Sequence, residues 1–258
     1  MTAGPDDRVL LRPLTARSIV LSLLLGSHPP QLPVNRIVRA VEPFGVAEST
    51  VRVAVSRMVA AGDLLRAGGT YRLSERLLDR QARQDDAVGP ETVAWHGDWE
   101  LVVITAVGRD PADRAALRTQ LAALRLAELR EGIWMRPANL RRAWPSHLDA
   151  VLRRFTGRPD DDPSTLAAQL WDAPGWATTA RALLHHLDSA EHPGERFTAA
   201  AAAVRHLLTD PVLPPALLPP DWPGDTLRAR YTAYQHETAY QHETAAAQLI
   251  DGQLTDRG

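Results

Sequence analysis

Apolar positions in the first third of the chain recur at the spacing of three successive helices. The first pattern covers residues 15–25, and the second covers residues 34–42. The second helix is expected to end before Pro43, because the residue that precedes a proline avoids the α region. The third pattern covers residues 48–61, and Gly62 is predicted to stop that helix at its C-terminus.

A hairpin is predicted directly after the third helix. The stretch "DLLRAGGTYRL" gives two short strands around Gly68 and Gly69, a pair that readily supplies the positive φ angles of a tight turn. Arg66 and Arg72 flank this turn. Helix, turn, helix and hairpin, in that order, are the plan of a winged helix-turn-helix.

The third helix has one apolar face and one polar, cationic face. At about 100° per residue, the apolar face consists of Val51, Val55, Met58 and Val59. On the opposite face, arginine can contact guanine or phosphate, and serine and threonine can donate to either. A solvated helix face is the alternative, and the arginine-bearing hairpin behind the helix argues against it. The predicted DNA-binding residues are Ser49, Thr50, Arg52, Val53, Ser56, Arg57, Arg66 and Arg72.

Proline- and glycine-rich segments divide the rest of the chain. "DDAVGPET" precedes a middle segment, and "TGRPDDDPS" separates that segment from a helical tail. The middle segment is predicted to contain strands at 99–107, 132–136 and 150–155 and a helix at 111–128. The tail is predicted to contain helices at 164–172, 176–190 and 195–208 and a long one from Gly224. We therefore expect a mainly helical α+β protein with a winged helix-turn-helix at 1–88, a middle domain at 89–160 and a helical dimerisation and effector domain at 161–258.

The hexapeptide TAYQHE occurs twice in tandem, at 232–237 and 238–243. It is too short to be a structural repeat, and it is interpreted as a duplication within a helix. A shift of six residues turns a helical face by about 120°, so this helix is expected to be exposed or tolerant of rotation.

The net charge of −2 conceals a division along the chain. Residues 8–83 contain twelve arginines against five acidic residues, which gives +7. Residues 84–258 contain seventeen arginines against twenty-four acidic residues, which gives −7, and residues 1–7 supply the remaining −2. A basic first third on an acidic body predicts that one domain faces a polyanion.

Composition narrows the class of protein further. The chain has no cysteine, which excludes disulfides, thiolate metal sites and cysteine nucleophiles. Its longest apolar run, residues 19–25, is far too short to span a bilayer, and no basic-then-apolar signal segment is visible. A cytoplasmic protein is therefore expected.

Four stretches resemble one known family, the phenylacetate-degradation repressor (PaaX) family. "EPFGVAESTVRVAVSRMVAAGDL" resembles its recognition segment, and "WHGDWELVVI" and "LREGIWMRPANL" resemble its middle domain. "RHLLTDPVLPPALLPPDWPG" resembles the signature of its C-terminal domain. The four stretches lie in the family's order and span nearly the whole chain.

This resemblance implies a dimeric bacterial transcriptional regulator, usually a repressor, that binds double-stranded operator DNA. It implies a small-molecule effector such as an acyl-coenzyme A thioester, and a ferredoxin-like middle domain similar to a small CRISPR-associated nuclease. That nuclease fold carries a catalytic aspartate at the end of its first strand, whereas "WELVVITAVGRD" has no acid between Glu100 and Asp110. The middle domain is therefore predicted to be structural, and no enzymatic activity is expected.

Large side chains of the tail are candidates for an effector pocket. They are Trp144, Trp171, Trp176 and Trp222, and ordinary helix packing is the alternative for all four. His185 and Asp188 can share a helix face, but no third ligand is fixed, so neither a metal nor another cofactor is expected. No G-x-S-x-G motif occurs. The alternatives to a regulator are a winged helix that acts through protein contacts and a hydrolytic enzyme with an appended winged helix.

Overall fold

The computed structural model describes residues 11, 13–108 and 110–238 of the 258-residue chain. It is a mixed α/β structure with two antiparallel sheets in the described part. The chain forms two compact units. The first, called the head unit, lies within Met1–Val88, Ala180–Leu208 and Asp225–Gly258. The second, called the central unit, comprises Gly89–Thr179 and Thr209–Gly224.

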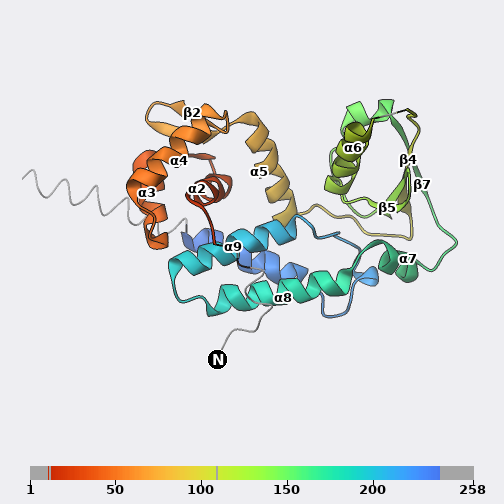
Figure 1. Cartoon of the computed structure of the whole chain (residues 1–258). Helices are drawn as coiled ribbons and strands as arrows, with labels where there is room; N and C mark the ends of the chain where they lie inside the picture. Colours follow the sequence, from red (N-terminus) through yellow and green to blue (C-terminus); the bar gives the residue numbers. More distant parts are fainter. Residues whose placement is uncertain (1–10, 12, 109, 239–258) are drawn as a thin grey trace, which may run out of the picture. The chain divides into compact units, whose positions relative to one another are not determined.

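In the described part of the first third of the chain, four α-helices belong to the head unit. The helix α2 lies between the others (Figure 1). Thr15 caps α2 by accepting a hydrogen bond from the Ser18 amide at 3.2 Å. Gly62 follows α4 with a φ of 71°, so the predicted helix stop is confirmed. The helices are α2 (Ala16–Leu25), α3 (Val34–Val41), α4 (Glu48–Ala60) and α5 (Glu75–Val88).

A three-stranded antiparallel sheet completes this region. It consists of β1 (Gln31–Pro33), β2 (Leu64–Ala67) and β3 (Thr70–Leu73), in the order β1-β3-β2. The predicted hairpin is β2–β3, and Gly68 and Gly69 at its turn both have positive φ angles. The strand β1 was not predicted from the sequence, because its three residues are too few to show a period.

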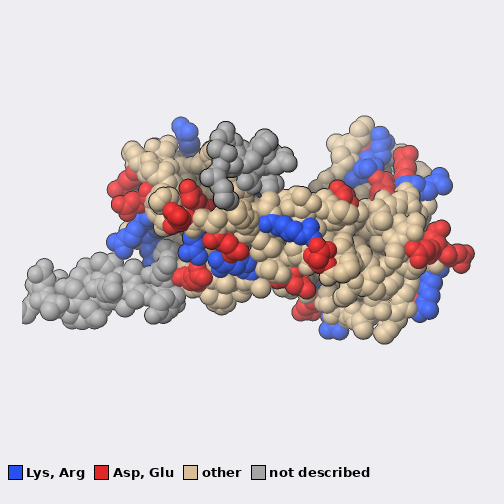
Figure 2. All heavy atoms as spheres, turned by 90° about the horizontal axis from the view of Figure 1, so that it is seen from below, with Lys and Arg blue, Asp and Glu red and all other residues tan. Residues whose placement is uncertain are grey.

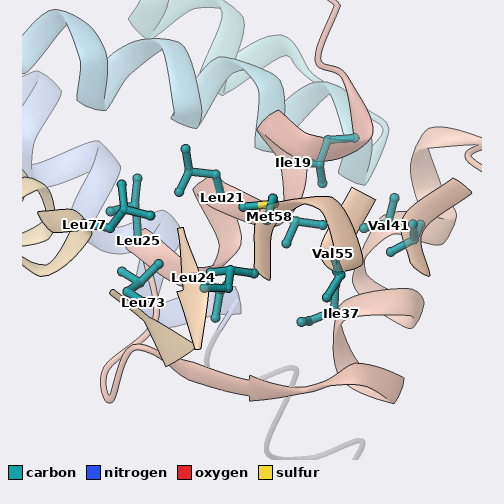
Figure 3. Close-up of a cluster of buried hydrophobic side chains, with 13 residues drawn as sticks. Ile19, Leu21, Leu24, Leu25, Ile37, Val41, Val55, Met58, Leu73 and Leu77 are labelled. Atoms are coloured by element: carbon teal, nitrogen blue, oxygen red, sulfur yellow. The ribbon is translucent and has the colours of Figure 1, made fainter. Parts of the chain in front are cut away.

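Apolar residues from the helices and the hairpin form one buried core (Figure 3). The core-face prediction for α4 is confirmed, since Val51, Val55 and Met58 are buried and Val59 packs against them. The other buried members are Ile19, Val20, Leu21, Leu24, Leu25, Ile37, Val41, Leu64, Leu73 and Leu77. Burial of this set fixes the side of α4 that remains exposed.

Part of the tail packs in the head unit. The helix α9 (Pro193–Leu207) packs against α5, and the Phe197 ring meets Phe44 edge to face at 5.2 Å. In the helical segment 224–238, Arg228 donates from Nε to the Ala87 carbonyl at 3.2 Å. The expected domain 161–258 is thus shared between the two units, and the division falls within α8 (Ala173–Ser189).

The central unit contains a four-stranded antiparallel sheet in the order β5-β6-β4-β7. Its elements are β4 (Trp99–Ile104), α6 (Pro111–Ala123), β5 (Ala127–Arg130), β6 (Ile133–Pro137), β7 (Leu152–Gly157) and α7 (Pro163–Leu170). The helix predicted at 111–128 was too long. It ends before Arg125, whose φ of 60° is incompatible with a continuing α-helix, and the strand β5 follows.

The two faces of this sheet have different covers. Val102, Trp134 and Leu152 pack against Leu117 and Leu121 of α6 on one face. The residues that alternate with them pack in a second cluster with α7, which contains Trp99, Met135, Leu166, Ala167 and Leu213. The central strands β4 and β6 are therefore covered on both sides and are rich in large apolar residues, whereas β7 is exposed after Leu152.

Candidate nucleic-acid interface

One side of α4 is exposed along the length of the helix. All six helix residues predicted to bind DNA lie on this side: Ser49, Thr50, Arg52, Val53, Ser56 and Arg57. Val53 is 49% exposed, which is unusual for a large apolar residue and leaves its methyl groups available for contact. The buried Val51, Val55 and Met58 hold the opposite side of the helix in the core. Substituting an exposed residue would therefore leave this packing intact.

The two arginines of this surface differ in their surroundings. The Arg52 guanidinium donates from Nε to Glu48 Oε1 at 2.7 Å, one helical turn away. Arg57, in contrast, has no acidic partner among the described residues. Arg57 thus presents an uncompensated charge, whereas Arg52 has to exchange Glu48 for any other anion.

The approach to α4 is a tight turn. The 3-10 helix η1 (Glu42–Phe44) follows α3, and Gly45 then adopts a φ of 66°. A glycine is suited to this left-handed conformation because it has no Cβ to clash with the following carbonyl. Ala47, the residue at the N-cap of α4, has no side-chain acceptor, so no side chain caps the first amides of the helix.

The hairpin carries its two arginines on opposite faces. Arg66 lies opposite Tyr71, whereas Arg72 lies opposite Leu65. Successive positions of a strand point to opposite faces, so the two guanidinium groups leave the hairpin in different directions. Both arginines are exposed, and neither forms an ion pair within the described part of the chain.

Asp63 anchors the hairpin to two helices, a role that sequence reasoning missed. Its side chain is buried and accepts from Arg17 of α2 at 2.6 Å and also from Arg76 of α5. The backbone of Asp63 also accepts from the Ser74 amide at 3.0 Å, which closes the base of the hairpin. The sequence feature that could have revealed this role is a lone acidic residue directly after Gly62, in a region that is rich in arginine.

Charge is distributed differently on another side of the molecule. On the side seen from below, Figure 2 shows arginines and acidic side chains interspersed in small clusters. The exposed side of α4 and the hairpin, where Arg57, Arg66 and Arg72 are unpaired, remains the candidate interface.

The four tryptophans proposed for an effector pocket do not gather at one place in the described structure. Trp144 donates to Asp149 at 3.0 Å and lies under the Arg154 guanidinium, 4.3 Å from its ring centre. Trp171 stacks on Trp99 with ring centroids 6.5 Å apart. Trp176 and Trp222 stack on each other at 4.5 Å. An effector role for them stays a prediction, with the stacked pair Trp176 and Trp222 as the two that the fold brings together.

The residues considered for metal binding and catalysis have other contacts. Asp188 accepts from Arg230 at 2.6 Å, and Asp110 caps α6 by accepting from the Asp113 amide at 2.8 Å. The Glu100 carboxylate accepts from Arg142 at 2.8 Å. Across the residues that the structure describes, no group of three metal-ligating side chains comes together, and no helix has the length and apolar character needed to cross a membrane.

The exposed, cationic side of α4 and the arginines of the hairpin are features that a DNA-binding regulator would use, and comparisons with known proteins specify the family. Residues 15–77 match the PaaX-like protein family, residues 92–152 match the PaaX protein central Cas2-like domain, and residues 172–248 match the PaaX-like protein C-terminal domain. The chain belongs to the PaaX-like family, a family of transcriptional repressors that bind DNA. The resemblance seen in the sequence is thereby confirmed.

A solved structure supports the same fold. The chain is similar to the uncharacterized protein Rv0674 from Mycobacterium tuberculosis, with 49% sequence identity and a TM-score of 0.76. The similarity covers 89% of this chain and 98% of the other. No functionally curated protein matches the chain.

Proposed function

We propose that α3, α4 and the β2–β3 hairpin form a winged helix-turn-helix whose recognition helix is α4. The observation that carries this proposal is the exposed side of α4, which combines small polar residues with arginine and is not covered by any described part of the chain. A 13-residue helix is about 20 Å long, enough to lie along a major groove. Family membership supplies the independent support, because relatives are DNA-binding repressors.

Each exposed side chain of α4 has a chemical role in this arrangement. Arg57 donates a bidentate pair to a guanine edge or clamps a phosphate, and Arg52 does the same after releasing Glu48. Ser49, Thr50 and Ser56 donate to phosphates or bases. Val53 contacts a thymine methyl group, the one apolar feature of the major-groove edge.

The hairpin is proposed to contact the DNA backbone. Arg66 and Arg72 leave it on opposite faces, so a hairpin tip placed in the minor groove would put one guanidinium against each flanking strand. Contacts of this kind give affinity without sequence preference, because phosphates are alike at every base pair.

We infer that the protein acts as a homodimeric repressor of a catabolic or secondary-metabolism operon. Two recognition helices must lie about 34 Å apart to meet successive major grooves of a palindrome. A small-molecule effector, such as an acyl-coenzyme A thioester, releases the DNA if it binds more tightly to a dimer with a different spacing. It can weaken DNA binding only by that difference in affinity.

The central unit is proposed to be a ferredoxin-like domain without catalytic activity. Its match to a Cas2-like domain supports the fold. Glu100 within its first strand and Asp110, the next acid after that strand, are engaged by Arg142 and by the α6 N-terminus, respectively. This arrangement supports a structural role.

Fluorescence anisotropy with the DNA upstream of the protein's own gene tests the DNA-binding proposal. Titration at several salt concentrations, beside a scrambled duplex of equal length, separates specific from electrostatic binding. We expect binding to the upstream DNA to be at least about a thousand times tighter than to the scrambled duplex. Equal affinity for both duplexes, or no binding at low salt, would refute the assignment and favour a winged helix that acts through protein contacts.

A further inference from the structure

A cavity of about 290 Å³ lies entirely within the head unit. The end of α2, the strand β1 and the helix α3 line one side of it, and α5, α9 and the segment 224–238 line the other. Their positions around α2 can be followed in Figure 1. The N-terminal region that is predicted to bind DNA and the family's C-terminal region thus share one cavity, and α3 is the helix that leads into the turn before α4.

Arg80 and Arg205 both line this cavity, which a third arginine, Arg36, also lines. Arg80 of α5 is partly buried, and Arg205 of α9 is more exposed. Neither forms an ion pair in the part of the chain that the structure describes. Burial and then the charges of Arg83, Arg17 and Arg76 lower the pKa of Arg80, and burial and then Arg80 lower the pKa of Arg205. The cavity therefore concentrates positive charge, and the nearby carboxylate of Asp85 pairs with the lining residue His28 at 3.1 Å rather than with either arginine.

One buried polar atom of the cavity wall also lacks a partner in the described structure. Gln84, one turn after Arg80, is buried, and its Oε1 atom has no hydrogen-bond partner. Buried amide oxygens in native proteins are nearly always hydrogen-bonded, so an unpaired one beside a cavity points to a missing polar ligand. Tyr231, which is 6% exposed, places an aromatic ring on the same wall.

Apolar side chains form the remaining walls. Leu32 of β1 and Phe197, Val204 and Leu208 of the α9 region all line the cavity. Ligand sites commonly combine a mainly apolar surface with a few polar groups that orient the ligand. The arginines at one part of this cavity and the apolar walls elsewhere fit an amphipathic molecule.

We propose that this cavity binds a small organic anion, namely an aromatic or branched carboxylate whose charged group pairs with Arg80 and Arg205. At roughly 30 Å³ for each water-sized group, the cavity holds about ten non-hydrogen atoms. A benzoate-sized acid fills it. An intact coenzyme A thioester is several times larger, so the site holds a free acid whole but only one end of such a thioester.

This inference rests on the proposed function in one respect, because it makes the bound acid the effector of the repressor. A ligand that fills the space between α3 and α9 favours one position of α3 against the other helices. The helix α3 precedes the recognition helix α4, so a shift of α3 also moves α4. Binding of the ligand then changes the affinity for DNA by as much as the ligand's own affinity differs between the two positions of α3. Binding of the acid itself can be tested without DNA.

Calorimetric titration of the full chain provides this test, with benzoate, benzamide and inorganic phosphate as probes. Benzamide has nearly the same shape as benzoate but no charge, and phosphate has charge but no apolar body. We expect benzoate to bind at least about tenfold more tightly than either one. Equal binding of benzoate and benzamide, or no binding of benzoate at millimolar concentration, overturns the proposal.

Variants of the two arginines locate the site. Arg80→Gln and Arg205→Gln are each expected to weaken benzoate binding about tenfold or more, because each removes a charge-assisted hydrogen bond. Arg205→Lys is expected to recover part of the loss. Arg39→Gln serves as the matched control, since Arg39 lies on α3, is exposed and does not line the cavity. Unchanged binding in both glutamine variants places the acid elsewhere and refutes the assignment. If Arg80→Gln fails to fold, the exposed Arg205 still provides the test.

DNA binding by the same variants distinguishes the two proposals. Arg80→Gln and Arg205→Gln are expected to bind operator DNA as the natural protein does but to lose release by benzoate. If benzoate binds in the cavity but does not change the affinity for DNA, the binding site is supported and its proposed role in regulating DNA binding is refuted. If the protein binds no DNA at all, the function proposed for α4 is wrong while the calorimetry still decides the site.

Discussion

Arginine has different roles in the two units of the molecule. In the head unit, Arg57, Arg66 and Arg72 are exposed and have no acidic partner in the described structure. In the central unit, Arg136 is fully buried on β6, and Arg142 and Arg118 pair with Glu100 and Glu128. A charged group that is buried or paired serves the fold, whereas an exposed, unpaired one is available for another molecule.

Arg136 joins three segments of the central unit. Arg136 donates to the Pro137, Arg125 and Val212 carbonyls at 3.1, 3.3 and 3.1 Å and to Asn139 Oδ1 at 2.9 Å. Burial, and then the like charge of Arg142, lower its pKa to about 9, so it remains protonated near neutral pH. Its hydrogen bonds are therefore charge-assisted, and they tie the proline-rich segment around Val212 to the sheet.

The largest expected effect follows from removing this arginine. Arg136→Met leaves several buried acceptors without a donor, and we expect the free energy of unfolding of the central unit to fall by about 3 kcal/mol or more. Urea unfolding followed by tryptophan fluorescence measures this, with Trp99 and Trp134 as buried reporters in that unit. A loss below about 1 kcal/mol would mean that the buried arginine contributes little to stability and would undo the comparison.

Removing Arg57, the unpaired arginine of α4, should have the opposite effect. It should weaken DNA binding and leave the stability of the protein unchanged. Arg57→Ala is expected to cost about 1–3 kcal/mol of operator binding, with an unchanged melting temperature, because the side chain contacts only solvent in the free protein. Arg52→Ala should cost less, since Glu48 already holds that guanidinium. Glu48→Gln frees Arg52 and should tighten DNA binding. Anisotropy titrations of the three variants sharpen the distinction, and equal losses for Arg52 and Arg57 would contradict it.

The hairpin provides a finer test. Arg66→Gln and Arg72→Gln are each expected to weaken binding to all DNA sequences alike and to reduce the slope of log K against log salt by about 0.9. The double variant should lose about twice as much, because the two side chains leave on opposite faces and reach different phosphates. If the salt slope changes in only one of the two single variants, only one of the two arginines contacts a phosphate, and the hairpin lies beside a single DNA strand.

The smallest effect is expected for a paired arginine on the surface of the central unit. Arg118 is about half exposed and pairs with Glu128 at 2.5 Å. Arg118→Ala should reduce the free energy of unfolding by no more than about 1 kcal/mol and should leave DNA binding unchanged. This variant also serves as the control for Arg57→Ala, and a loss of DNA affinity in it would extend the interface into the central unit.

Much of the head region could be predicted from the sequence, because its determinants are local. The spacing of Val51, Val55 and Met58 defines the buried face of α4 and therefore its exposed face. Gly62, Gly68 and Gly69 mark the helix stop and the hairpin turn, since each adopts a positive φ that other residues rarely tolerate. The family was also recognisable, because its motifs lie in order along the chain.

Other features depend on contacts between distant residues, and local patterns do not contain them. The buried alanines of α9, from Ala199 to Ala203, show only that something packs closely against the helix. The first TAYQHE copy was interpreted as exposed or tolerant of rotation, yet Tyr234 and Gln235 line the head-unit cavity; the second copy lies outside the described residues except for Thr238. The strand β5 was hidden because its short sequence continued an apparent helix.

The sequence by itself determined the helices, the hairpin, the exposed residues of α4 and the family, since periodicity, turn chemistry and motif order are properties of neighbouring positions. Only the tertiary structure decided which arginines are paired. Arg57 and Arg136 are the same residue type, and whether either meets a carboxylate or a carbonyl depends on segments many residues away, such as Val212 for Arg136. It also brought Arg80 and Arg205 together across 125 positions of the chain, because two helices distant in sequence pack in one unit.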